Sequence, residues 1–68
     1  MYDFDNETEI KRFIRQTTHR LRAELMQETD IILSREELWP IAVRVSYLVP
    51  GFNVTAEDEA NPYIGRKE

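Results

Sequence analysis

Hydrophobic and polar positions repeat with a helical period in two stretches of this chain. The first stretch, residues 6–27, contains no glycine or proline, and its apolar residues gather on one helix face. These residues are Ile10, Ile14, Leu21 and Leu25, with Phe13 at the edge. Asn6 is a suitable N-cap, and Glu9 follows it at the spacing of a capping box. We therefore predict a first helix over residues 6–27, with residues 1–5 as an acidic arm before it.

A second helix is predicted over residues 34–49. Ser34 and Glu37 have the spacing of a capping box, and the flanking Leu33 and Leu38 have the spacing of a hydrophobic staple. The residues that follow are apolar on two sides of a helix. One stripe comprises Leu38, Ile41, Ala42, Val45, Leu48 and Val49, and the other comprises Trp39, Val43 and Tyr47. A helix that is apolar nearly all round has to be covered on most of its sides.

Pro40 complicates this second helix, because a proline beyond the first turn lacks an N–H group and its ring disfavours a regular helix. Either the helix is kinked there, or a single turn leads into a helix that begins at Pro40. Residues 41–49 also alternate imperfectly and are rich in β-branched side chains, which leaves a strand as the alternative. Because the capping box favours a helix, we predict a mainly α fold, with an α+β fold as the alternative.

The predicted architecture is a two-helix antiparallel hairpin in one small domain of 68 residues. We expect the first helix to contribute Ile10, Phe13, Ile14, Leu21 and Leu25, and the second Leu38, Ile41, Val45 and Leu48. An extended C-terminal segment is expected to lie across the two helices, with residues 52–55 as a candidate short strand. Residues 56–68 are mostly polar, and we expect them to form a loosely ordered tail.

The second apolar stripe points to association with another chain. A domain of this size buries only about 60% of its unfolded surface, so it has little material with which to cover two stripes. The chain has no cysteine, which excludes disulfides and thiolate zinc sites as other sources of stability. We therefore expect a homodimer or a protein partner, with Trp39, Val43 and Tyr47 as apolar anchors. The alternative is that residues 52–63 cover this stripe within one chain.

Charge is segregated along the sequence, although the net charge is only −4. Basic residues fall on one side of the first predicted helix: Arg12, Arg15, His19 and Arg22, flanked by Lys11. We call these four residues the basic stripe. Arg12, Arg15 and Arg22 are the residues expected to give charge complementarity to an acidic protein partner. The same stripe could follow a phosphate backbone, but the sequence pI of about 4.9 argues against nucleic acid.

No set of residues in the sequence indicates catalysis or a metal site. The one histidine, His19, has arginine neighbours that make it a poor base and a poor ligand, so we expect a solvated helix position. Residues 57–59 are acidic but lack the ligand spacing of a calcium loop, and we expect a solvated acidic loop. The two glycines do not form a phosphate-binding loop. We predict no cofactor, no metal and no small-molecule substrate.

The expected function is that of a non-catalytic adaptor, regulator or inhibitor that acts through a protein–protein interface. The alternative is a dimeric nucleic-acid-binding regulator that uses the basic stripe. No export signal is recognisable, and no apolar run approaches the roughly 20 residues needed to span a bilayer. We therefore expect a cytoplasmic, soluble protein that does not act at a membrane.

Overall fold

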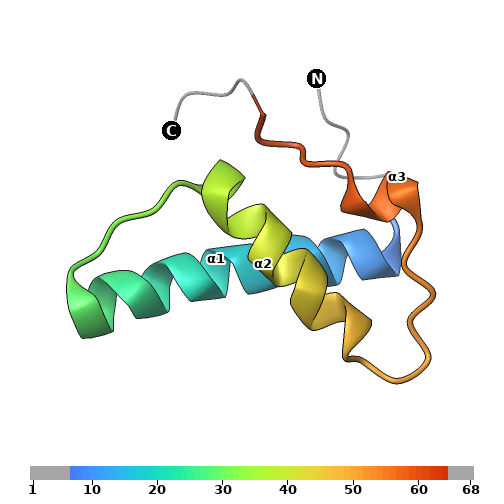
Figure 1. Ribbon diagram of the computed structural model, residues 1–68, viewed down its shortest axis with the longest axis horizontal. Helices are drawn as coiled ribbons and strands as arrows, with labels where there is room; N and C mark the ends of the chain where they lie inside the picture. Colours follow the sequence, from blue (N-terminus) through green and yellow to red (C-terminus); the bar gives the residue numbers. More distant parts are fainter. Residues whose placement is uncertain (1–6, 65–68) are drawn as a thin grey trace.

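The computed structural model describes residues 7–64, which form three helices and no strand (Figure 1). Helix α1 covers Glu9–Thr29, α2 covers Arg35–Tyr47 and α3 covers Ala56–Glu59. The prediction of a mainly α fold is confirmed, and the α+β alternative is wrong, because residues 41–47 are helical. Residues 52–55 form no strand either. The acidic arm at 1–5 lies outside the described residues.

Helix α1 begins later than the sequence pattern predicted. Its N-cap is Thr8, whose hydroxyl oxygen accepts a hydrogen bond from the backbone N–H of Lys11 at 3.0 Å. The predicted capping box of Asn6 and Glu9 is therefore wrong, since Glu9 is the first residue of the helix. The helix ends at Thr29, and its C-cap, Asp30, adopts the left-handed conformation (φ 60°) common at helix ends. Within the described range, no helix is long and apolar enough to cross a membrane.

Helix α2 runs through Pro40 without restarting there. Ser34 and Glu37 form the predicted capping box in both directions. In a regular helix the N–H of residue 40 would bond to the carbonyl of Glu36, and proline has no such N–H. The side-chain amide of Asn61 takes this place and donates to the Glu36 carbonyl at 3.0 Å. A distant residue thus supplies the hydrogen bond that Pro40 removes.

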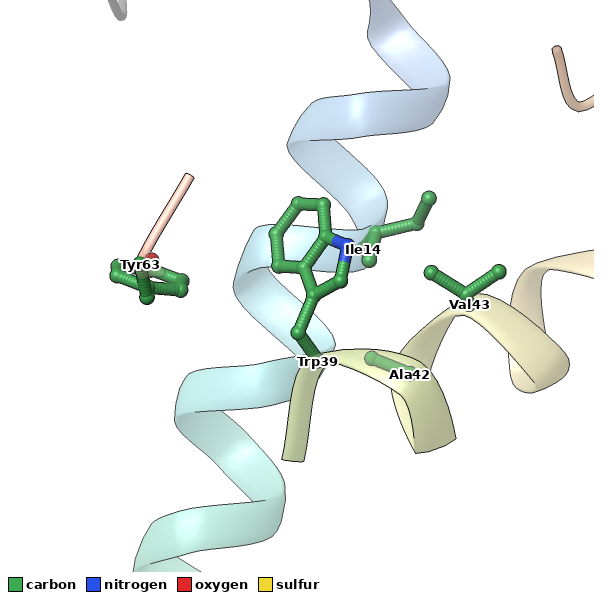
Figure 2. Close-up of a cluster of buried hydrophobic side chains, with 5 residues drawn as sticks. All are labelled: Ile14, Trp39, Ala42, Val43 and Tyr63. Carbon is green, nitrogen blue, oxygen red and sulfur yellow. The ribbon is translucent and has the colours of Figure 1, made fainter. Parts of the chain in front are cut away.

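Helix α2 packs against α1 and crosses it obliquely (Figure 1). The antiparallel hairpin stays a prediction. The core consists of Ile14, Trp39, Ala42, Val43 and Tyr63. Figure 2 shows the Trp39 ring over α1 near Ile14, with Tyr63 on one side and Val43 on the other. Small or short side chains are fully buried on both helices, which suits a close crossing. They are Thr18 on α1 and Ala42 and Ser46 on α2.

The predicted inner face of α2 is wrong at two of its four positions. On α1, the expected Ile14 is buried and Ile10, Phe13 and Leu21 pack against the core. On α2, Leu38 is buried as expected, but two of the other predicted core positions are on the surface. Ile41 is 48% exposed and Leu48 is 81% exposed. Turning Trp39 inward in their place buries the largest apolar side chain in the sequence.

The segment after α2 is packed against both long helices. The ring of Phe52 meets that of Phe13 edge to face, with centroids 5.4 Å apart. Residues 56–59, expected to belong to a loose tail, form α3, and Tyr63 beyond it is 8% exposed. The indole N–H of Trp39 donates to the carbonyl of Glu59 at 2.8 Å. This segment covers Trp39 because it offers both an aromatic ring and a hydrogen-bond acceptor.

Candidate interaction surface

Of the three predicted apolar anchors, two lie in the core and one lies on the surface. Trp39 is 1% exposed and Val43 is 6% exposed, whereas Tyr47 is 54% exposed. The rings of Trp39 and Tyr63 meet edge to face at 5.8 Å. Trp39 and Val43 are therefore not the exposed anchors that the sequence suggested. The C-terminal segment covers their stripe within one chain, and only Tyr47 remains on the surface.

An open groove of about 480 Å³ lies between α2 and the segment that follows α3. Its lining comprises Trp39, Pro40, Val43, Arg44, Tyr47, Glu59, Asn61 and Ile64. Of these, Tyr47 and Ile64 are exposed apolar residues, at 54% and 67%. A volume of this size can accept one or two side chains of a bound peptide. The groove thus presents apolar surface beside one cation, Arg44, and one anion, Glu59.

Tyr47 and Glu59 interact across this groove. The pKa of the Tyr47 hydroxyl is raised above its usual value, mainly because the hydroxyl donates a hydrogen bond to the Glu59 side chain. Desolvation and the negative charge of Glu59 act in the same direction. A raised pKa means that the Tyr47 hydroxyl keeps its proton to higher pH than an isolated tyrosine does.

Four exposed residues line the side of α2 that faces away from α1: Glu37, Ile41, Arg44 and Leu48. We call them the outer stripe. Their spacing of four, three and four residues places them in one line along the helix. Leu48 is 81% exposed, which is the highest value among the exposed large hydrophobic side chains of the described chain. The outer stripe and the groove adjoin, since Arg44 belongs to both.

The basic stripe is engaged in contacts within the chain. Arg15 donates to the carboxylate of Glu7 at 2.8 Å, and Arg12 lies 3.4 Å from the same carboxylate. The Glu7 side chain is 1% exposed, whereas those of Arg12 and Arg15 are 55% and 24% exposed. Arg22 donates from Nε to the carbonyl of Leu33 at 3.2 Å. Two of the three arginines predicted to bind a partner are thus already paired with an acid.

His19 has a structural role that the sequence did not reveal. Its Nδ1 accepts a hydrogen bond from Nε of Arg35 at 3.1 Å, and its Nε2 lies 3.3 Å from the hydroxyl of Tyr63. Because Nδ1 accepts, the proton of the neutral ring is on Nε2 and points to the Tyr63 oxygen. His19 therefore links α1, α2 and the C-terminal segment, and the expected solvated position is wrong. No group of three or more potential metal ligands occurs within residues 7–64.

Asp58 is a buried carboxylate that the sequence analysis missed, because we assigned residues 57–59 to a solvated acidic loop. It is 3% exposed and accepts hydrogen bonds from the backbone N–H of Thr55 at 3.1 Å and from the hydroxyls of Thr55 and Thr8. Burial alone would raise its pKa, but these hydrogen bonds and the charge of Lys11 outweigh burial, so the pKa is lowered. The Thr55–Asp58 spacing is that of a capping box and was the available signal.

No protein-family model, no curated protein and no solved structure matches this chain.

Proposed function

We propose that the protein is a non-catalytic interaction module, an adaptor, regulator or inhibitor, which binds another protein chain through the exposed side of α2. The observation that carries this proposal is the apolar surface left uncovered there. Ile41, Tyr47 and Leu48 are all at least 48% exposed, and Tyr47 lines an open groove. Tyrosine and arginine, which are common at the centres of protein interfaces, both line that groove.

The groups that most resemble catalytic ones have structural partners, which supports a non-catalytic role. His19 is held between Arg35 and Tyr63. The buried carboxylate of Asp58 joins the N-caps of two helices through Thr8 and Thr55. Both side chains therefore make hydrogen bonds that stabilise the fold.

The alternative of nucleic-acid binding through the basic stripe has weaker support. Phosphate contacts require cations that can leave their present partners at low cost. Arg15 is held by a carboxylate whose side chain is 1% exposed, and Arg22 is held by the carbonyl of Leu33. We therefore favour a protein partner.

A selection from a displayed library of random peptides tests the proposal. Peptides enriched on the wild-type protein should bind Tyr47→Ala and Leu48→Glu at least about tenfold more weakly, because both substitutions alter the exposed side of α2. Titration calorimetry on synthetic copies of the peptides gives the affinities.

Met26→Glu is the matched control, because Met26 on α1 is 54% exposed, the same fraction as Tyr47. Its affinity for the selected peptides should equal that of the wild type. Peptides that bind all three variants with unchanged affinity would place the binding surface elsewhere. A selection without enrichment would contradict the proposal as well.

A further inference from the structure

The outer stripe of α2 has the pattern of a helix that pairs with another helix. Glu37, Ile41, Arg44 and Leu48 are all exposed and follow one another at intervals of four, three and four residues. Residues at these intervals share one line of a helix surface, which is where the helices of a pair meet. The helix face opposite to this stripe is already buried against α1 and Tyr63. The stripe is therefore the side of α2 on which a further helix can pack.

The charges on this stripe are complementary to those of a second copy in one orientation. In an antiparallel pair of α2 helices with a twofold axis passing between Pro40 and Ile41, Glu37 of each copy lies opposite Arg44 of the other. Ile41 then meets Ile41 of the other copy near the axis. A parallel pair would instead place Glu37 against Glu37 and Arg44 against Arg44, which like-charge repulsion disfavours.

Both charged groups have capacity for such a contact. The side chain of Arg44 makes no hydrogen bond or ion pair with any other residue between 7 and 64. One oxygen of Glu37 accepts a long hydrogen bond of 3.4 Å from the backbone N–H of Ser34. An ionised carboxylate can accept several hydrogen bonds, so the other oxygen can take an arginine without breaking the capping box.

We infer that the outer stripe of α2 binds a second copy of this chain in an antiparallel, twofold-symmetric helix pair. This inference rests on the proposed function, because it names one partner for the exposed side of α2. Each dimer gains two Glu37–Arg44 pairs, the contact between the two Ile41 side chains, and cover for Leu48 at each end. The groove beside Tyr47 and Ile64 lies next to the helix pair.

Two oppositely charged variants test this arrangement. Glu37→Arg alone places two arginines opposite each other, and Arg44→Glu alone places two glutamates opposite each other. Each variant should self-associate roughly tenfold more weakly than the wild type, because two attractive pairs become two repulsive ones. An equimolar mixture of the two variants restores both opposite-charge pairs. Light scattering from about 10 μM to about 1 mM should therefore show stronger association in the mixture than in either variant alone.

Two further variants complete the test. Glu36→Arg makes the same charge change one residue away from the outer stripe, and it should self-associate like the wild type. Leu48→Glu changes the other end of α2, away from the capping box, and should also weaken self-association. It therefore tests the interface even if Glu37→Arg disturbs folding. Helical circular dichroism of every variant verifies the fold.

Failure of this inference differs from failure of the proposed function. A wild-type protein that stays monomeric over the whole range would overturn the inference, whereas the peptide selection decides separately whether α2 binds other chains. A wild-type dimer that survives both charge reversals would also overturn it, as would a mixture that stays monomeric. An effect of Glu36→Arg equal to that of Glu37→Arg would show that the outer stripe is not the interface.

Discussion

The most specific structural prediction concerns the hydrogen bond by which Asn61 completes α2. Its side-chain amide donates to the Glu36 carbonyl at 3.0 Å, and its side-chain oxygen accepts from the N–H of Tyr63 at 2.9 Å. Asn61→Asp preserves the shape and the acceptor oxygen but removes the donor. The substitution therefore removes the bond that replaces the missing N–H of Pro40, and it adds a negative charge at position 61.

The expected loss of stability is that of one solvent-exposed hydrogen bond. A net hydrogen bond contributes about 0.5–1.5 kcal/mol, so Asn61→Asp should lower the free energy of unfolding by about 1 kcal/mol. In a domain of this size that is a loss of roughly 4–8 °C in Tm. In a Pro40→Ala background, residue 40 has its own N–H, which can bond to the Glu36 carbonyl. The donor of Asn61 is then redundant, and its removal should cost close to zero, apart from effects of the new charge.

Urea unfolding followed by circular dichroism gives the four free energies of this double-mutant cycle. Any repulsion between the carboxylate introduced at position 61 and its surroundings is nearly the same in both backgrounds and largely cancels. We expect a coupling energy of about 1 kcal/mol between positions 40 and 61. An equal cost of Asn61→Asp in both backgrounds would refute the argument that Asn61 replaces the N–H that Pro40 lacks.

Three further predictions concern the core, the surface and pH. Trp39→Ala removes a fully buried ring at a cost of about 3–5 kcal/mol, which should abolish most of the helical circular dichroism of so small a domain. Leu48→Ala, at a position 81% exposed, should change the free energy of unfolding of the isolated chain by less than about 0.5 kcal/mol. The lowered pKa of Asp58 means that its carboxylate stabilises the fold above the unfolded-state value of 3.8 and that this stabilisation is lost as the pH falls below it. The Tm of Asp58→Asn should accordingly vary less with pH than that of the wild type between about pH 5 and pH 2.

Local signals in the sequence were sufficient to predict that the chain is mainly helical and where α2 begins. The Ser34–Glu37 capping box depends only on four consecutive residues, and it is present as predicted. The apolar face of α1 is likewise a local pattern, and Ile14 lies at its centre in the structure. Such features are predictable because the residues that make them are neighbours in the sequence.

The inward side of α2 could not be predicted because both of its stripes are apolar. The choice between Trp39 and Ile41 depends on Tyr63, which is distant in sequence and packs edge to face on Trp39. The cap of α1 poses the same difficulty. Thr8 is favoured by its hydroxyl contact with Asp58, a residue 50 positions away. Contacts between residues so far apart in the sequence produce no periodic pattern in the sequence around either residue.

The sequence predicted an exposed apolar surface on α2, but it predicted only part of the residues that form this surface. The apolar excess around α2 was visible in the sequence, and Tyr47 is exposed as expected. The sequence analysis assigned Ile41 and Leu48 to the core, yet both are exposed, and they take the place of Trp39 and Val43 on the surface. Leu38 and Ala42 of the first predicted stripe nevertheless stay buried.

We propose that the exposed side of α2 is a binding surface, above all for a second copy of the chain. The most direct measurement is the light-scattering mass of the wild type over a range of concentrations, with Leu48→Glu measured alongside. The wild-type mass should rise from 8.1 kDa toward twice that value, whereas Leu48→Glu should stay near 8.1 kDa. A wild-type mass of 8.1 kDa at every concentration, or equal association by Leu48→Glu, would contradict the proposal.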